Sequence, residues 1–323
     1  MSSCVETQIN KETALNWQRA QRLVFIGEAD VDIHYVELFH SSNHHTIVIS
    51  PGRCESYEKY QEIAIELFHL GYNVFIVDHR GQGLSSRLLS NPHKGYVVAF
   101  DDYAKDLVTF ISDKVKPKIT NAPFLLAHSM GAAIAVRALQ LSPNLVQSAV
   151  LCSPMIQINS GDMPIGLAKL IIKFRCLLDT LLAKESGYFI NQGDYKAKSF
   201  AENELTHSTE RYQSFINLYQ STPNIQLGGV TNHWLSEAVK ANQKIFNDLC
   251  QLRAPLMLLQ AGMDSIVDND AQNQFCSEAA RFCPISGPIV FAKAKHELLF
   301  EIDEIRSEVI HQIQSFFETS MSN

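Results

Sequence analysis

Apolar residues in this chain occur either in short unbroken runs or at helical spacing. An unbroken run of four or five apolar residues is typical of a buried strand, whereas apolar residues every three or four positions indicate an amphipathic helix. The runs predict strands at Arg22–Ile26, Ile33–Phe39, Thr46–Ser50, Val74–Val77, Phe124–Ala127, Ser148–Cys152, Pro255–Gln260 and Pro288–Phe291. The periodic segments predict helices at Tyr57–Leu70, Phe100–Val115, Met130–Leu141, Trp234–Leu249, Asn269–Ala280 and Asp303–Phe317.

The predicted strands and helices alternate along most of the chain. This order is typical of a mostly parallel sheet with helices on both faces. In Ile33–Phe39 apolar and polar residues alternate, so this strand is expected to be antiparallel and half exposed at the start of the sheet. The predicted fold class is therefore α/β.

The alternation stops between residues 157 and 229 and resumes afterwards. This stretch is rich in helix formers and contains no clear buried strand. We therefore predict a helical cap at 157–229, inserted between two parts of one α/β core at 1–156 and 230–323. Within the cap, Leu167–Leu182 is apolar on most of its circumference and also carries cations. It is interpreted either as a helix facing the core or as one contacting a membrane surface or an acyl chain.

Composition and charge narrow the class of protein. The 323 residues are 46% hydrophobic, which suffices for one large domain. A formal charge of −7 and a pI near 5.9 argue against a nucleic-acid partner. Met1–Thr7 lacks the features of a secretory signal, and no apolar run is long enough to span a membrane. Seven dispersed cysteines without a C-x-x-C pair indicate reduced thiols, so an intracellular protein is expected.

The segment Phe124–Ala135 contains a candidate nucleophile. Its apolar run stops at Ser129, and a run of small helix formers follows at once. In a nucleophile elbow the serine lies on a sharp strand-to-helix turn, and the residues two before and two after it must be small. Here they are Ala127 and Gly131, so the motif is A-x-S-x-G instead of G-x-S-x-G. The alternative is a buried strand that ends in an ordinary Ser-Gly turn.

A serine hydroxyl needs a base, and the base needs a carboxylate that orients it. In the α/β-hydrolase fold these partners follow in the order serine, acid, histidine, on loops after later strands. Asp264 follows the strand at Pro255–Gln260, and His296 follows the last predicted strand. Asp268 is the rival acid, although its place before a helix also suits an N-cap. The sequence favours Asp264 because it comes first after the strand.

The same chemistry needs two N–H donors for the oxyanion that forms on attack. One is expected from the residue after the nucleophile, Met130, and one from the loop after an earlier strand. In that loop Pro51 and Gly52 precede Arg53, whose backbone N–H is the second candidate. An ordinary turn at Pro51-Gly52 is the alternative.

Several blocks of the sequence resemble a known family, the bacterial PldB-type lysophospholipases of the monoacylglycerol-lipase group of α/β-hydrolases. The similarity runs from about Lys11 to Phe317. The Ala-His-Ser-Met-Gly elbow and the Pro-Gly-Arg motif are both common in that family. The blocks that carry it are Ser50–Tyr60, Asp78–Ser85, Phe100–Tyr103, Leu126–Gly131, Leu205–Ser208 with Arg211 and Tyr212, and Thr231–Trp234.

The resemblance implies a triad of Ser129, Asp264 and His296, with Arg53 and Met130 as the oxyanion donors. It also implies an α/β-hydrolase fold, lysophospholipid substrates and peripheral attachment to the cytoplasmic side of a membrane; some members transfer acyl groups. The expected enzyme is a serine carboxylic-ester hydrolase without metal or organic cofactor. The alternatives are a monoacylglycerol lipase, a general carboxylesterase, or a non-catalytic hydrolase-like lipid-binding protein. The sequence leaves the oligomeric state undetermined.

Overall fold

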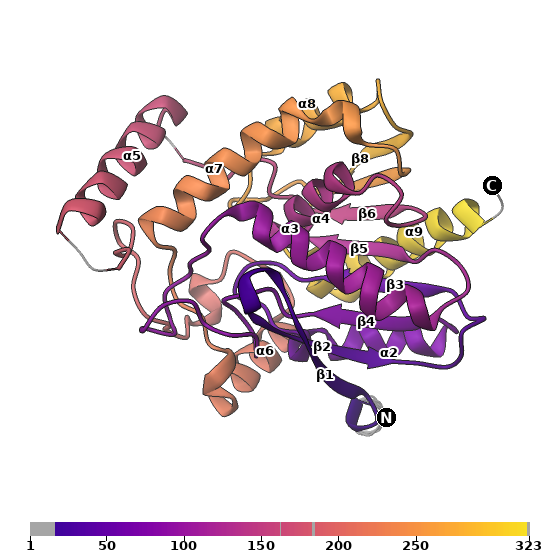
Figure 1. Cartoon of the computed structure of the whole chain (residues 1–323). Helices are drawn as coiled ribbons and strands as arrows, with labels where there is room; N and C mark the ends of the chain where they lie inside the picture. The colour runs from indigo at the N-terminus through magenta and orange to yellow at the C-terminus, as the bar shows by residue number, and fades with distance from the viewer. Residues whose placement is uncertain (1–16, 162, 183–184, 322–323) are drawn as a thin grey trace.

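The computed structural model describes residues 17–161, 163–182 and 185–321 (Figure 1). The N-terminal residues in which no secretory signal is expected lie outside this part of the chain. Eight strands form one sheet in the order β1-β2-β4-β3-β5-β6-β7-β8. Their bounds are β1 Gln21–Ile26, β2 Asp32–Leu38, β3 Thr46–Ser50, β4 Asn73–Val77, β5 Phe124–His128, β6 Ala149–Cys152, β7 Leu256–Ala261 and β8 Ile285–Phe291.

Helices connect these strands. The α-helices are α2 Gln61–His69, α3 Phe100–Thr109, α4 Met130–Leu141, α5 Ile165–Leu182, α6 Thr209–Ser221, α7 Asn232–Asn247, α8 Asn269–Ala279 and α9 Asp303–Met321. A π-helical turn, η3 Phe110–Val115, continues α3. The 3-10 turns are η1 Glu28–Asp30, η2 Tyr57–Tyr60, η4 Lys116–Lys118, η5 Phe200–Glu202, η6 Pro223–Ile225, η7 Leu249–Gln251 and η8 Leu298–Phe300.

The pairing of the strands confirms the predicted α/β class. β2 pairs antiparallel with β1 and with β4, and the other neighbours pair in parallel. The last strand begins at Ile285 and not at the predicted Pro288, since Ile285 and Ser286 already pair with β7. β8 lies at the edge of the sheet and is partly exposed, so its first residues lack the unbroken apolar pattern of a central strand.

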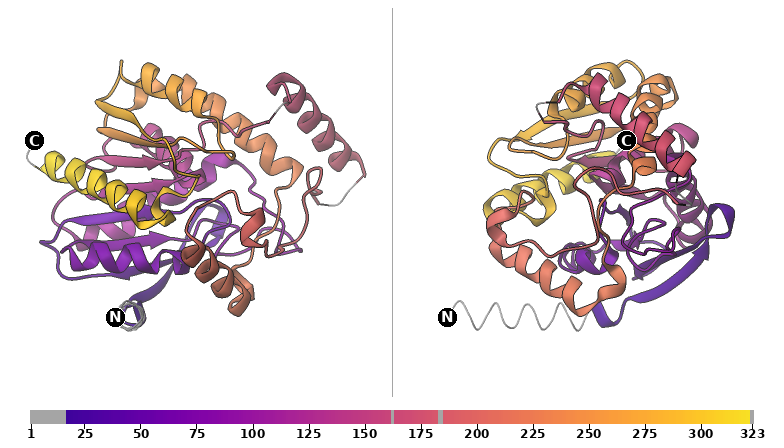
Figure 2. Two further views of the ribbon diagram at one scale, coloured as in Figure 1. Left: turned by 180° about the vertical axis from the view of Figure 1, so that it is seen from behind. Right: turned by 90° about the vertical axis from the view of Figure 1, so that its left-hand side faces the viewer.

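Two apolar layers bury the two faces of the sheet. Alternate residues of one strand enter opposite layers, as Val48 enters one while Ile47 and Ile49 enter the other. Helices α3, α4, α7 and α8 cover the first face, and α2 and α9 cover the second (Figures 1 and 2). Burial on both faces is the physical reason that the central strands are unbroken apolar runs.

The predicted cap region lies outside the sheet. Between the end of β6 at Cys152 and the start of β7 at Leu256, the described residues add no strand to the sheet. This part contains α5 and α6, and α5 packs against α7 on the side away from the sheet (Figure 1). Within the described part of the chain, no helix has both the length and the hydropathy to cross a bilayer.

Candidate active site

The candidate nucleophile, Ser129, lies on the turn between β5 and α4. Its backbone has φ 51° and ψ −116°, a conformation that is costly for a residue with a Cβ atom. Such a strained turn is what lifts the serine of a nucleophile elbow above the sheet. The side chain is nearly buried, with 6% of the residue exposed. The turn is therefore sharp, as the A-x-S-x-G motif predicted.

The two small residues of the motif have different surroundings. A Cβ atom on Gly131 would lie 2.2 Å from the carbonyl oxygen of Ser50 and 2.3 Å from that of Pro51. Ala127, by contrast, is an interior residue of β5, paired with Ser50 and Leu151, and its methyl group packs in the core. The steric demand of the elbow thus falls on Gly131, and the methyl group at position 127 fits.

The structure brings the two predicted partners to the serine. The Nε2 atom of His296 lies 2.8 Å from Oγ of Ser129, and its Nδ1 atom lies 2.7 Å from Oδ2 of Asp264. The other oxygen of Asp264 accepts hydrogen bonds from the N–H groups of Ile266 and Val267. Burial alone would raise the pKa of the Asp264 carboxyl, but the hydrogen bond and charge of His296 and the two N–H donors lower it. The carboxylate therefore stays ionised beside the imidazole.

The rival acid, Asp268, has another partner set. It is the N-cap of α8, and its Oδ1 atom accepts from the N–H groups of Asp270 and Ala271 at 2.9 and 3.0 Å. Its Oδ2 atom accepts a hydrogen bond from the side chain of Gln157. Both oxygens of Asp268 are thus used in holding the loop and the helix, and it is Asp264 that contacts His296.

The predicted oxyanion donors lie on neighbouring loops. β3 and β5 are parallel neighbours with Ser50 paired to Ala127, so the loop at Arg53 and the start of α4 at Met130 share one edge of the sheet. The Arg53 side chain extends to the end of the predicted cap, near residue 229. There it donates to the carbonyl of Gly228 and lies over the ring of Trp234. The backbone N–H groups of Arg53 and Met130 remain the predicted donors to the oxyanion.

A buried charged cluster beside the triad was not predicted from the sequence. Its side chains are Glu55, Lys59, Glu297 and His128. One oxygen or nitrogen atom from each of Glu55, His128 and Glu297 lies within 4.8 Å of the others, close enough for a shared cation. Lys59 supplies that positive charge, since its Nζ atom lies 2.8 Å from Glu55 and 2.6 Å from Glu297. The donor set is therefore that of a lysine ion-pair network and not of a metal site.

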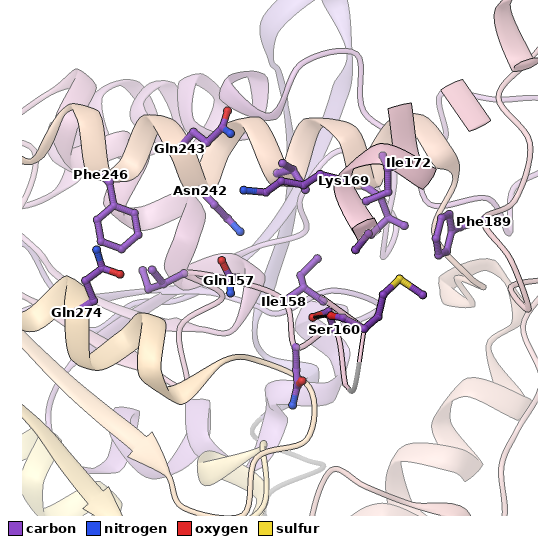
Figure 3. A pocket seen from close by; sticks show the side chains of 16 residues that line it. Gln157, Ile158, Ser160, Lys169, Ile172, Phe189, Asn242, Gln243, Phe246 and Gln274 are labelled. Carbon is purple, nitrogen blue, oxygen red and sulfur yellow. Dashed lines mark hydrogen bonds between the residues drawn. The ribbon is translucent and has the colours of Figure 1, made fainter. Parts of the chain in front are cut away.

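A cavity of about 440 Å³ lies beneath the predicted cap, between α5, α7 and the middle of α8 (Figure 3). Its walls are mixed: Ile158, Ile172, Phe189 and Phe246 are apolar, whereas Gln157, Asn159, Lys169, Asn242, Gln243 and Gln274 are polar. It contains no residue of the triad. It begins at Ile156, next to Met155, whose N–H group donates to the carbonyl of Ser129.

Helix α5 carries an exposed apolar stripe. Leu167, Leu170, Phe174, Leu177 and Leu181 follow helical spacing and are 49–69% exposed. The cations Lys169 and Lys173 lie on the same helix. A single exposed apolar residue is ordinary, but a contiguous stripe of five is a candidate interaction surface, which we call the α5 stripe.

Comparison with known proteins places this chain in a family. The sequence model of the family described as "Serine aminopeptidase, S33" matches residues 41–303. The chain belongs to this family. The predicted resemblance is confirmed, since Escherichia coli lysophospholipase L2 is 38% identical over 304 residues, which cover 93% of this chain and 88% of that protein. The rat monoglyceride lipase is 26% identical, over 84% of this chain and 81% of the relative.

Solved structures give the same fold. A soluble variant of monoglyceride lipase from Saccharomyces cerevisiae superposes with a TM-score of 0.67 at 16% identity, covering 94% of each chain. A carboxyl esterase from Bacillus coagulans superposes with a TM-score of 0.69 at 16% identity, covering 93% of this chain and 98% of that one. The α/β-hydrolase fold is confirmed, and the family makes this chain a serine hydrolase.

Proposed function

We propose that this serine hydrolase releases the fatty acyl chain of lysophospholipids. The observation that carries the proposal is the hydrogen-bonded chain from Ser129 through His296 to Asp264, with separations of 2.8 and 2.7 Å. The choice of substrate rests on the similarity to lysophospholipase L2 along nearly the whole chain. Monoacylglycerols are the alternative substrate class, because monoglyceride lipases are also relatives.

The reaction follows from the positions of these groups. Oγ of Ser129 attacks the acyl carbonyl carbon, and Nε2 of His296 takes the hydroxyl proton. Asp264 holds the proton on Nδ1, which keeps Nε2 available as the base. The backbone N–H groups of Arg53 and Met130 are the proposed donors to the resulting oxyanion.

Collapse of this tetrahedral intermediate breaks the ester bond. His296 gives the proton to the departing glycerol oxygen and leaves an acyl-enzyme on Ser129. Water then attacks this ester with His296 again as base, and the free fatty acid leaves. If the hydroxyl group of a second lysophospholipid molecule attacked in place of water, the same steps would give acyl transfer. Every step uses groups of the chain, the lipid substrate and water, so the proposed mechanism needs no cofactor.

We further propose that the cavity beneath the cap receives the acyl chain. Its apolar residues line a volume within the ordinary range for ligand pockets, and it begins one residue beyond Met155. The α5 stripe is proposed to contact a membrane surface that contains the substrate. Its leucines and phenylalanine, with the exposed Lys173 on the same helix, have the composition of a helix that lies in an anionic interface.

The proposed function is tested by product analysis. Purified wild-type protein and Ser129→Ala are each given lysophosphatidylcholine, lysophosphatidylethanolamine and a monoacylglycerol of equal chain length. We expect fatty acid from the lysophospholipids with wild-type protein and a loss of about 10³-fold or more with Ser129→Ala. Faster release from the monoacylglycerol would favour the alternative, and no release from any of them would favour a non-catalytic lipid-binding protein.

A further inference from the structure

The buried cluster links the two loops that the proposed chemistry uses. Glu55 lies on the loop between β3 and η2, Lys59 lies in η2, and Glu297 directly follows His296. Each of the three side chains is at most 7% exposed. Buried charges are stable only when they are paired and hydrogen-bonded. Here the ammonium group of Lys59 lies between the carboxylates of Glu55 and Glu297, which come from loops far apart in the sequence.

Glu55 fixes the loop that precedes Arg53. Its Oε2 atom accepts a hydrogen bond from the N–H group of Gly52 at 2.5 Å and from the hydroxyl of Tyr60 at 2.6 Å. The carbonyl of the same Gly52 accepts from the side chain of Gln82 at 2.7 Å. Both peptide groups of Gly52 are thus held by buried side chains. The orientation of the next peptide N–H, that of Arg53, follows from this arrangement.

Glu297 ties the other end of the cluster to the histidine loop. Its backbone N–H donates to the carbonyl of Leu205, and its Oε1 atom accepts from Lys59 at 2.6 Å. The ring of His128 lies 4.9 Å from the ring of His296, centroid to centroid, between this loop and Glu55. The position of His296 is therefore supported by Lys59 through Glu297 and by the packing of His128.

The charges of the cluster are consistent with a fixed, ionised Glu55. Burial would raise the pKa of Glu55, but the charge of Lys59, the hydrogen bonds from Lys59 and Tyr60 and, in acid, the charge of protonated His128 lower it to about 2. Burial and the neighbouring Glu55 charge raise the pKa of Glu297. Burial lowers the pKa of His128 to about 4, so its ring is neutral at pH 7. At pH 7 Glu55 thus keeps the acceptor capacity that the loop needs.

We propose that Glu55, Lys59 and Glu297 form a positioning network that couples the oxyanion loop to the histidine loop. The proposal rests on the proposed function of Ser129 and His296. Glu55 acts through the N–H group of Gly52 and Glu297 acts through His296, with Lys59 as the shared link. None of the three is proposed to touch the substrate. Such a network stabilises the transition state more than the bound ester, because negative charge on the carbonyl oxygen develops only as Ser129 attacks.

The central test compares Glu55→Gln with wild-type enzyme on p-nitrophenyl butyrate, a soluble ester that does not depend on lipid preference. We expect kcat to fall by about 10- to 100-fold while KM stays within about twofold, since misplacement of donors costs transition-state stabilisation only. Affinity for a trifluoromethyl ketone, which forms an oxyanion with Ser129, should fall by the same factor as kcat. Equal kcat in both proteins would overturn the proposal.

The linkage between the two loops has its own test. Glu55→Gln and Glu297→Gln share Lys59, so the double variant should lose less activity than the product of the two single losses. A strictly multiplicative loss would overturn the coupling. Lys59→Arg keeps the positive charge and should retain more activity than Lys59→Met; equal activity of the two would also count against it. If Glu55→Gln does not fold, the Glu297→Gln and Lys59→Arg variants decide the question alone.

Glu58→Gln is the matched control. Glu58 lies in the same turn as Lys59, but its carboxylate accepts from Trp17 and Arg22 on the outer side. This variant should keep the wild-type kcat and inhibitor affinity. Wild-type protein that neither turns over the ester nor reacts with a fluorophosphonate at Ser129 would overturn the proposed function and the network with it. Active wild-type protein with an unchanged Glu55→Gln variant would overturn the network alone.

Discussion

The Nε2 atom of His296 lies 2.8 Å from the Oγ atom of Ser129, although 167 positions separate the two residues in sequence. The elbow follows β5 near the middle of the sheet, whereas His296 follows β8 at its edge. The contact therefore depends on the loops after β7 and β8 reaching back across the carboxyl ends of the strands. Substitutions that alter these loops should affect activity and stability in separable ways.

Substitutions of Asp264 and Asp268 should separate an effect on activity from an effect on stability. Asp264→Ala should lower kcat by about 10³- to 10⁴-fold, because His296 loses the partner that orients its ring. Asp268→Ala should keep most of the activity and lose about 1 kcal/mol of unfolding free energy, because α8 loses its N-cap. Ester turnover and urea unfolding of both variants provide the measurements. The reverse pattern would make Asp268 the triad acid.

Gly131 and Ala127 should respond differently to the exchange of one methyl group. Gly131→Ala forces a Cβ atom to within 2.2 Å of a backbone carbonyl oxygen, so we expect a loss of about 1–3 kcal/mol and a displaced elbow with little turnover. Ala127→Gly creates the commoner G-x-S-x-G motif and should cost only about 0.5–1 kcal/mol with activity retained. Urea unfolding and fluorophosphonate labelling measure both. Normal labelling of Gly131→Ala would contradict the steric account.

The cavity beneath the cap should set the preferred acyl-chain length. Val239 lines it, and Val239→Trp should fill part of the volume. We expect a lower kcat/KM on long-chain lysophospholipids and little change on p-nitrophenyl butyrate. Lys240→Trp is the matched control, because this neighbouring side chain is exposed and pairs with Glu237. An equal loss of activity on long and short chains would argue against acyl binding in the cavity.

The α5 stripe should govern binding to membranes. Leu170→Glu with Phe174→Glu places two charges on the exposed stripe, so co-sedimentation with anionic phosphatidylglycerol vesicles should fall while turnover of a soluble ester stays unchanged. Leu70→Glu is the control, since Leu70 is an equally exposed apolar residue beside α2. Unchanged vesicle binding would contradict the proposal that the α5 stripe contacts a membrane. A stripe that instead joins two copies of the chain would show as a change in oligomeric state.

Buried histidines should make the fold sensitive to acid. Burial lowers the pKa of His79 to about 3 and that of His128 to about 4, whereas an unfolded chain titrates histidine near 6.5. As the pH falls from about 6.5 to about 4, the unfolded chain binds protons that the native state does not. Each group should therefore remove about 1.4 kcal/mol of unfolding free energy per pH unit across that window.

Urea unfolding at several pH values between 4 and 7 measures this dependence. His79→Gln should reduce the change of unfolding free energy with pH by the contribution of one histidine. His311→Gln, on the exposed face of α9, should leave this pH dependence unchanged. A wild-type slope in His79→Gln would show that His79 titrates alike in both states.

Local pattern accounts for most of the fold and for part of the site. The apolar runs predicted the central strands because burial on both faces leaves a local signature, whereas the predicted start of the partly exposed edge strand β8 was wrong. The order of the residues along the chain brought out Ser129, Asp264 and His296 together. The sequence favoured Asp264 but could not exclude Asp268, because the direction in which a loop turns is a tertiary property. The same limit applies to the link from Lys59 to Glu297, whose partners are 238 positions apart.

The local sequence pattern also did not predict which face of α5 is buried. An apolar helix of this kind can bury any of several faces, and only packing against α7 decides which one. Ile171 and Leu178 are half-buried in the structure, whereas Leu170 and Phe174 point outward. The spacing of apolar residues therefore predicted a helix without predicting which residues a membrane would contact.

The late position of His296 in the chain has a consequence for synthesis. A ribosome completes the elbow and the cap region long before it makes β8 and the loop that follows. Until the loop after that edge strand is made, Ser129 has no histidine to take its proton. An enzyme that cleaves membrane-derived lipids thus acquires its activity only when nearly all of its own fold exists.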